Sequence, residues 1–378
     1  MEKLWTKQFI FLTFSLFLIF TGFYFLLPTL PLYIKKLGSS ESEIGLIVGL
    51  FTISAVLFRP VIGGMLDRFG RQPFIIWGVL LFVVSMYLYD WVSGIFVLML
   101  LRFIHGLSWA ASTTSVGTAI TDIIPASRRG EGMGWYGIGT TLAMAIGPLL
   151  GLWILNHYSF HTLFLTATVI TFIAFLILFF TKTPFKSNQN QQKRIEIFDP
   201  SLLPVSIVIF FLAVSYGGIT TFLPLFADSL KVNAGTFFLV YAIALTLSRP
   251  ISGKLSDRFS EKAVLIPSLI LTCIGLIWIS YSEGLVGLII AAILYGIGFG
   301  SAQPALQTAI INLAHPDRKG VANASFFTAF DLGIGLGSII LGWISQITSY
   351  EILFLAASIS VILSLLLLIT IVKQPQDK

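Results

Sequence analysis

The amino-acid sequence carries one motif twice, in two places separated by about half the length of the chain. Residues 59–69 read RPVIGGMLDRF, and residues 249–259 read RPISGKLSDRF. The same offset of 190 positions pairs Gly147 with Gly337 and Trp153 with Trp343 in this chain of 378 residues. The chain is therefore a duplication of one unit, and each half is expected to fold in the same way.

The composition is that of a chain surrounded by lipid. Hydrophobic residues make up 56% of the sequence and charged residues only 11%, with a mean hydropathy of +0.93. A soluble domain carries roughly 25% charged residues, so this chain cannot cover its surface in water. Despite a net charge of +6, no nucleic-acid partner is expected, because the basic residues are scattered among short polar segments. The bilayer is the expected partner.

The apolar segments predict twelve membrane-spanning helices, six in each repeat, since a span needs about 20 mainly apolar residues. The fold class is all-α integral membrane, with two six-helix pseudo-symmetric bundles at residues 1–182 and 201–378 and a polar linker at 183–200. The predicted spans are 8–34, 43–66, 72–91, 95–121, 132–156, 161–181, 202–227, 235–256, 262–281, 285–312, 321–346 and 351–372.

The distribution of lysine and arginine predicts the orientation. With twelve spans, both termini and the linker lie on one side of the membrane. Only Lys35, Lys36 and Lys231 lie on the opposite side, out of 23 lysines and arginines. Because basic residues are enriched in cytoplasmic loops, we expect cytoplasmic termini in a multi-pass protein of the cell membrane, in a bacterial cell.

Three motifs resemble those of one transporter family. Residues 63–73, GGMLDRFGRQP, look like the signature loop of the major facilitator superfamily. Residues 98–106, LMLLRFIHG, resemble its buried-arginine motif, and residues 137–151, GIGTTLAMAIGPLLG, resemble the motif of its antiporter branch. The resemblance covers the whole chain and is nearest to the twelve-span drug:proton antiporters. It implies a monomer that moves small-molecule substrates by alternating access, with the proton as coupling ion.

The signature loop is expected to form a conformational gate at the cytoplasmic side. A carboxylate at the end of a helix can accept hydrogen bonds from the N–H groups that begin another helix. The resemblance implies that Arg71 pairs with Asp122, and that the second latch is weaker because Ser260, Glu261 and Asn312 replace the corresponding residues. The predicted gate residues are Gly63, Asp67, Arg68, Gly70, Arg71, Asp122, Asp257 and Arg258.

Two residues of the span 95–121 are candidates for proton coupling. Arg102 lies inside the span, where a charge costs roughly 2.5–3.5 kcal/mol and normally faces the bundle interior. The resemblance implies that Arg102 touches the substrate path or assists proton release. His105 stands where many relatives have glutamine, and histidine can exchange a proton near neutral pH. The alternative for His105 is a hydrogen bond to a neighbouring helix.

Asp331 is the third candidate, because it is the only acid deep within a predicted span. Burial disfavours the charged form of a carboxyl group, so Asp331 is expected to bind a proton outside and release it inside. The alternative is a static ion pair with Arg102 or another buried donor. Relatives often have an acid in the first span, and residues 9–34 contain none.

The glycines of the antiporter motif allow close helix packing, and Pro148 favours a bend; this motif consists of Gly139, Gly147, Pro148 and Gly151. Such a helix could rock across the interface between the halves, and the alternative is a tightly packed pair of helices. The resemblance also implies a substrate path between the first, fourth, seventh and tenth spans. Its candidate residues are Tyr24, Trp109, Thr113, Tyr216, Thr220, Tyr295, Gln303 and Gln307.

Proton-coupled efflux of small organic molecules is the function that these features indicate, with multidrug resistance as one outcome. A dedicated exporter of one metabolite, such as a sugar, nucleoside or metallophore, is the alternative within transport. A non-transporting membrane sensor or membrane enzyme is the alternative from another class. The sequence shows no nucleotide-binding loop, metal-ligand cluster or catalytic triad spacing, so we expect neither an enzyme nor a metal or organic cofactor.

Overall fold

The chain forms an all-α structure in the part that the computed structural model describes, residues 3–92, 94–125, 128–183, 199–258, 261–313 and 319–370. The helices of the first half are α1 (Lys7–Lys36), α2 (Glu41–Phe69), α3 (Gln72–Leu88), α4 (Ile95–Ile123), α5 (Arg129–His157) and α6 (Phe160–Phe180). Those of the second half are α7 (Leu203–Ser229), α8 (Ala234–Arg258), α9 (Glu261–Ser280), α10 (Leu285–Leu313), α11 (Lys319–Ile347) and α12 (Tyr350–Thr370).

These helices confirm the predicted fold class. Each predicted span corresponds to one helix, and no end differs by more than three residues. Ten described helices are long and apolar enough to cross a membrane, and α3 and the 234–249 part of α8 are shorter apolar helices. Their surfaces expose large apolar side chains, such as Trp77, Phe96 and Phe180, at 70% or more. Lipid is the solvent that suits such a surface.

Contacts divide the chain into two compact units. One contains Met1–Tyr33 and Ile53–Ile195, and the other contains Ile34–Thr52 and Glu196–Lys378. The first part of α2 therefore belongs to the second unit, although the rest of α2 belongs to the first. The sequence-based boundaries at residues 182 and 201 remain a prediction, since they describe the repeats rather than this grouping by contacts.

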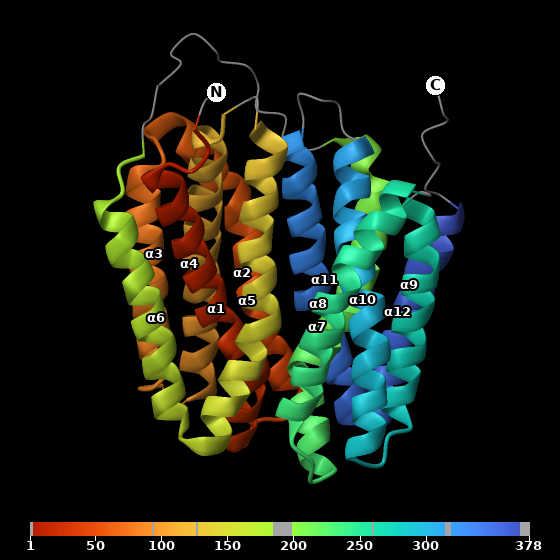
Figure 1. Cartoon of the computed structure of the whole chain (residues 1–378). Coiled ribbons are helices and arrows are strands. Elements are labelled where there is room, and N and C mark those ends of the chain that lie inside the picture. The colour runs from red at the N-terminus through yellow and green to blue at the C-terminus, as the bar shows by residue number, and fades with distance from the viewer. Residues whose placement is uncertain are drawn as a thin grey trace. The chain divides into compact units, whose positions relative to one another are not determined.

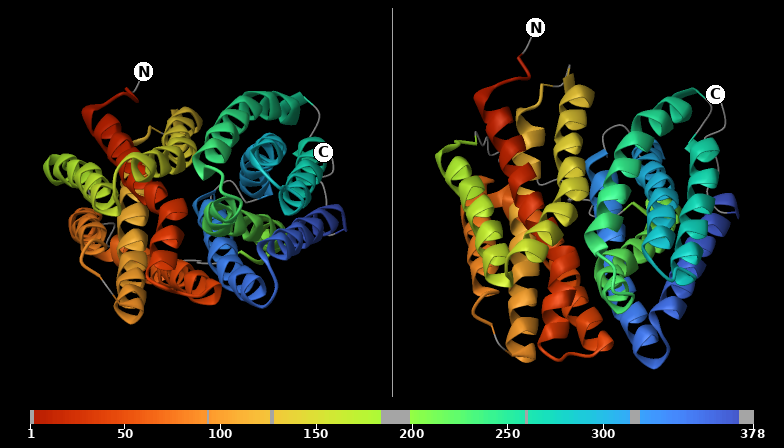
Figure 2. Two further views of the ribbon diagram at one scale, coloured as in Figure 1. Left: turned by 90° about the horizontal axis from the view of Figure 1, so that it is seen from below. Right: turned by 60° about the horizontal axis from the view of Figure 1, so that its bottom comes forward.

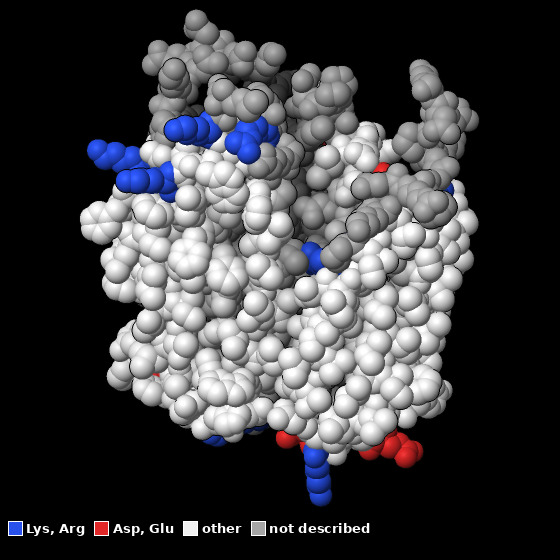
Figure 3. Space-filling view, in the orientation of Figure 1, with Lys and Arg blue, Asp and Glu red and all other residues white. Residues whose placement is uncertain are grey.

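The two units repeat the same helix pairing (Figure 1). In the first, α3 packs against α4 and α6; in the second, α9 packs against α10 and α12. The end-on view of Figure 2 shows the helices of each unit running side by side as a bundle. On the face drawn in Figure 3, lysine and arginine gather at one end of the first-unit helices, whose middle is uncharged. This pattern fits helices whose ends meet water and whose middles meet lipid.

Candidate functional site

The connection between α2 and α3 is a tight turn that depends on a glycine. Gly70 has φ of +87°, in the left-handed region that glycine enters without steric cost. Its N–H donates to the Leu66 carbonyl at 3.0 Å and thereby caps the end of α2. The next residue, Arg71, returns to the same carbonyl through Nη1 at 2.9 Å. The turn therefore fixes the arginine against the helix that precedes it.

Arg71 also joins this turn to the end of α4. Its Nε lies 2.9 Å from Asp122 Oδ2, and the two side chains are 13% and 38% exposed. The ion pair that the family resemblance implies is thus present in the first unit. Gly63 lies within α2, and a Cβ there would meet no atom within 4 Å. The side chains of the other predicted gate residues, Asp67, Arg68, Asp257 and Arg258, lie outside the described part.

The second repeat places different chemistry at the same two positions. Glu261, at the start of α9, corresponds to Arg71, which lies just before α3. Asn312, near the end of α10, corresponds to Asp122, near the end of α4. Asn312 Nδ2 donates to Glu261 Oε1 at 2.8 Å. The contact survives the duplication, but its ion pair is replaced by a hydrogen bond with one charged partner.

A buried polar cluster lies between α3 and α4 of the first unit. Arg102 is 2% exposed and His105 and Tyr89 are completely buried. Arg102 Nη1 lies 3.3 Å from the Tyr89 hydroxyl, which lies 2.9 Å from His105 Nδ1. Arginine can only donate, so the Tyr89 oxygen accepts from Arg102, and the same hydroxyl is hydrogen-bonded to His105 Nδ1.

Sequence reasoning identified two members of this cluster and missed Tyr89. The hydroxyl bridges two candidate proton-coupling residues, and the ring of Phe82 covers His105 at a centroid distance of 4.6 Å. The predicted alternative for His105, a hydrogen bond to a neighbouring helix segment, describes this arrangement. The sequence shows Tyr89 only as a tyrosine at the end of an apolar segment. Nothing in the sequence indicates which residue its hydroxyl contacts.

The glycines of the antiporter motif face α1 within the first unit. A Cβ at Gly147 would overlap the Tyr24 side chain, and one at Gly151 would lie 2.6 Å from the Phe25 carbonyl oxygen. Gly139 is less tightly enclosed, with its nearest atom, Phe17 Cβ, at 3.7 Å. The motif, with Pro148 inside α5, therefore holds α5 and α1 at close range.

Three predicted path residues lie together in the first unit. Trp109 stacks on Phe23 with centroids 4.3 Å apart and planes at 27°, and Tyr24 contacts the same phenylalanine edge to face at 5.4 Å. Thr113 gives its hydroxyl hydrogen to the Trp109 carbonyl at 2.7 Å. This part of the unit is a mainly aromatic cluster between α1 and α4.

The second unit contains a matching aromatic cluster between α7 and α10. Tyr216 stacks on Phe299 at 4.8 Å and 13°, and the Tyr295 hydroxyl lies 3.1 Å from Ser215 Oγ. Thr220 is fully buried and donates to the Tyr216 carbonyl at 2.9 Å. The remaining two predicted path residues, Gln303 and Gln307, are half-buried on α10.

Asp331 is half-buried on α11, directly after the aromatic residue Phe330, which stacks on Tyr216 at 5.9 Å. Gly335, one turn further, faces α2, where a Cβ would lie 2.6 Å from Thr52 Cβ. The predicted proton carrier therefore follows a member of the aromatic cluster along α11 and lies one turn before Gly335.

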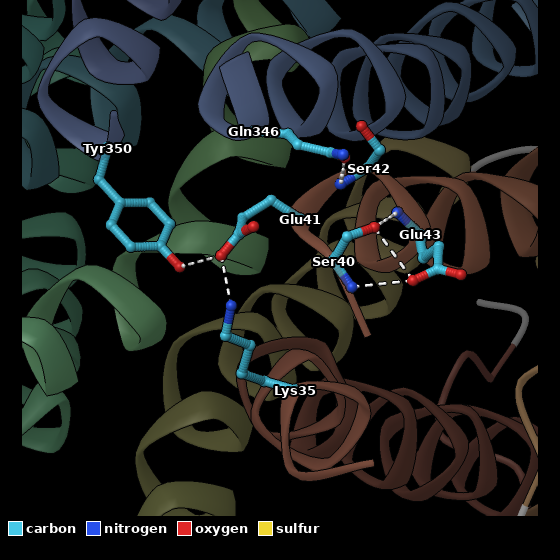
Figure 4. A network of polar contacts seen from close by, with 7 residues as sticks. All are labelled: Lys35, Ser40, Glu41, Ser42, Glu43, Gln346 and Tyr350. Atoms are coloured by element: carbon cyan, nitrogen blue, oxygen red, sulfur yellow. Dashed lines mark hydrogen bonds and ion pairs between the residues drawn. The ribbon is translucent and has the colours of Figure 1, made fainter. Parts of the chain in front are cut away.

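The first part of α2 is joined to α11 and α12 by a polar network (Figure 4). Glu41 Oε1 accepts from Tyr350 Oη at 3.1 Å and forms an ion pair with Lys35. The Ser42 N–H donates to Gln346 Oε1 at 3.2 Å. This outer network, Lys35, Glu41, Ser42, Gln346 and Tyr350, was not identified from the sequence, because the contacts Ser42–Gln346 and Glu41–Tyr350 join residues more than 300 positions apart.

Close backbone packing accompanies this network. A Cβ at Gly45 would overlap the Ser338 carbonyl, one at Gly49 would lie 2.8 Å from the Gly335 carbonyl oxygen, and one at Gly342 would lie 2.6 Å from the Glu41 carbonyl oxygen. Small residues on both helices thus bring α2 and α11 together. Ser40 and Glu43 form a capping box at the start of α2, with Ser40 N–H to Glu43 Oε2 at 2.8 Å.

No group of three or more histidine, cysteine, aspartate or glutamate side chains suited to a metal ion occurs among the described residues. The polar side chains named above are instead spread over helix ends and helix contacts. They can hold helices together, exchange protons or donate hydrogen bonds to a small molecule.

Comparisons with known proteins agree with this architecture. The family model described as Major Facilitator Superfamily matches residues 12–336 and 205–378. The Staphylopine export protein of Staphylococcus aureus is 26% identical over 92% of this chain and 91% of its own length. The Quinolone resistance protein NorA of the same species is 27% identical over 98% of both chains. Among solved structures, a mutant of the nucleoside transporter NupG has a TM-score of 0.79 and 16% identity, covering 97% of this chain and all of its own.

Proposed function

The chain belongs to the major facilitator superfamily of membrane transporters, and we propose that it exports small organic molecules across the cell membrane in exchange for protons. The observation that carries this proposal is the similarity, over more than nine-tenths of the chain, to two proteins named for export and for drug resistance. The glycine-proline motif of α5 supports the same direction of transport, since residues 137–151 resemble the motif of the family's antiporter branch.

The proposed orientation places both termini in the cytoplasm of a bacterial cell, with one chain acting as a monomer. The basic residues support it, because 17 of the 23 lysines and arginines are predicted to lie on the side of the termini. In this orientation the Arg71–Asp122 ion pair lies at the cytoplasmic face and the outer network at the opposite face.

Asp331 is the proposed proton carrier. It is the described carboxylate that lies well inside a helix, and charged groups placed there mark ion and substrate pathways. Each proton that enters the cell supplies roughly 2.3 kcal/mol per 100 mV of membrane potential, in addition to the pH gradient. Arg102 and His105, which the Tyr89 hydroxyl bridges in the first unit, are the other proposed proton-coupling residues.

Inverted membrane vesicles with an acidic interior test this function. Candidate substrates are added while a pH-sensitive dye reports the gradient. We expect a compound to collapse the gradient only in vesicles that contain the protein. Equal behaviour of vesicles with and without the protein, across lipophilic cations, anions and neutral compounds, would contradict proton-coupled efflux.

A dedicated exporter of one metabolite is the second candidate function. It is favoured by the similarity to a protein named for a single exported compound, staphylopine. A substrate panel separates the two: one active compound indicates the dedicated exporter, and many unrelated compounds indicate drug efflux.

A further inference from the structure

An arginine lies well inside the helices of the second unit. Arg249 is a half-buried residue of α8, separated from the end of the helix at Arg258 by more than two turns. A charged side chain in the hydrocarbon region is costly and is usually retained where it faces a polar path or a ligand. Arg249 is not among the residues that we assigned to the gate, the proton route or the substrate path.

Close packing of α8 and α10 fixes the position of this arginine. A Cβ at Gly296 would lie 2.8 Å from Ala244 Cβ, and one at Gly300 would lie 2.8 Å from Leu245 Cα. Gln303 follows Gly300 on the same face of α10, since residues three apart are neighbours on a helix. Arg249 Nη2 donates to Gln303 Oε1 at 3.0 Å. The helix contact therefore places the guanidinium beside a predicted residue of the substrate path.

Arg249 and Gln303 together offer mainly hydrogen-bond donors to a ligand. A guanidinium has five N–H donors and no acceptor. The amide oxygen of Gln303 is used by Arg249, so the amide contributes its NH2 group. Charge-assisted hydrogen bonds from such groups suit a carboxylate or a similar oxyanion, which arginine can bind with two parallel bonds. A cationic ligand would meet the positive charge of the guanidinium and no negative charge in this pair.

Two observations extend the argument beyond the pair. Among described side chains more than a turn from a helix end, three arginines, Arg59, Arg102 and Arg249, accompany one carboxylate, Asp331. Arg59 occupies the position in the first repeat that Arg249 occupies in the second. Each repeat thus keeps a cation at the equivalent helix position, which favours anions.

We propose that the second unit selects organic anions, and that Arg249 with Gln303 recognises their carboxylate. This inference rests on the proposed export function and names its substrate class. Arg249 sets specificity by binding the anionic group, and Gln303 both positions the guanidinium and adds N–H donors.

The test uses two fluorescent rhodamines that differ only by a methyl group, one with a free carboxylate and the other its methyl ester. Binding to the purified full-length protein is followed by fluorescence anisotropy, and proton-driven transport is followed in inverted vesicles. Loss of a charge-assisted hydrogen bond typically costs about tenfold or more in affinity. We therefore expect the wild type to bind and transport the carboxylate dye about tenfold better than the ester.

The variants assign this preference to residues. Arg249→Gln and Gln303→Glu should lose the preference for the carboxylate while still binding the ester, which also reports that they are folded. Arg249→Lys should keep part of it, because the charge remains without the planar fork. Arg128→Gln, at the start of α5, is the matched control and should behave as the wild type.

The outcomes separate this inference from the proposed function. Equal or better binding of the ester by the wild type would overturn the selection of anions. Proton-driven transport of the ester in that case would still support the proposed export function. Unchanged preference in Arg249→Gln would also overturn the inference. Tighter binding of the carboxylate dye that depends on Arg249, without proton-driven transport of either dye, would support the anion site and contradict the export function.

Discussion

The two repeats use the same positions for different chemistry at the helix ends and for the same packing inside the helices. Arg71 and Asp122 form an ion pair in the first unit, whereas Glu261 and Asn312 form a hydrogen bond with one charge in the second. In contrast, Gly147 and Gly337 both allow close helix contact, with Tyr24 and Val214 respectively. Duplication has therefore preserved the packing, and the polar contacts have changed.

This contrast has a physical reason. Replacing a glycine at a backbone contact requires one helix to move, which costs free energy in any sequence. A polar contact at a helix end meets water or lipid headgroups, so different donor and acceptor pairs are tolerated there. Differences between the repeats at polar positions are thus the places where directional function can arise.

The largest effect is expected from the carboxylate that only the second repeat has. Asp331 corresponds to Thr141 in the first repeat. Asp331→Asn removes the group that can carry a proton, so active efflux should be abolished while the protein still reaches the membrane. Substrate-driven collapse of a pH gradient in vesicles measures this.

Glu283→Gln is the matched control for Asp331→Asn, since it removes an exposed acid in the loop before α10. It should keep the full rate. Proton-driven efflux by Asp331→Asn at the rate of the wild type would remove Asp331 from the mechanism.

The next effect should be equal in both repeats. In Gly147→Ala the new Cβ would overlap Tyr24 Cβ, and in Gly337→Ala it would lie 2.8 Å from Val214 Cα. Overpacking of this kind typically costs about 1–3 kcal/mol, so both variants should lower the midpoint of thermal unfolding in detergent. Gly137→Ala, in the same helix as Gly147 but with no atom within 4 Å, should cause no loss. A midpoint for Gly147→Ala equal to that of Gly137→Ala would contradict close packing as the reason for this glycine.

A smaller effect is expected when the second repeat is given the ion pair of the first. The double variant Glu261→Arg with Asn312→Asp should strengthen the contact between the ends of α9 and α10. Exposed ion pairs contribute about 0–1 kcal/mol, so the maximal transport rate should fall by no more than about fivefold. Initial rates in vesicles at saturating substrate measure the change, and a rate above that of the wild type would contradict the expected direction.

An effect of similar size is expected in the outer network. Tyr350 corresponds to Phe160 in the first repeat, so Tyr350→Phe makes the repeats alike at this place. It removes one hydrogen bond to Glu41, which keeps its ion pair with Lys35. A loss of about 0.5–1.5 kcal/mol in unfolding free energy is expected. Denaturant titration of the purified protein measures it, and a larger loss in Tyr350→Phe than in Gly147→Ala would reverse the proposed ranking.

The helices and the duplication could be predicted because they depend on local composition. Runs of about 20 apolar residues fix the position of a span, and residues 59–69 and 249–259 identify the repeat directly. The Arg71–Asp122 contact was also predictable, since the family resemblance supplied a partner that spacing alone does not.

The contacts that were missed join distant segments through ordinary residues. Tyr89 lies between Arg102 and His105, yet its sequence neighbourhood is an apolar run with one other tyrosine, Tyr87. Glu41 meets Tyr350 only because glycines bring α2 and α11 together. The assignment of Ile34–Thr52 to the second unit was missed for the same reason, because it depends on helix contacts that hydropathy does not reveal.

Charge reversal at the first-repeat ion pair is the most direct measurement of how the repeats differ in function. Purified wild type, Arg71→Glu and the exchange Arg71→Glu with Asp122→Arg are reconstituted in liposomes, and substrate-driven proton flux is recorded. Arg71→Glu puts two carboxylates at a contact now spanning 2.9 Å, so its flux should fall about tenfold or more, and the exchange should restore part of it. Flux in Arg71→Glu equal to that of the wild type would contradict a functional role for this ion pair.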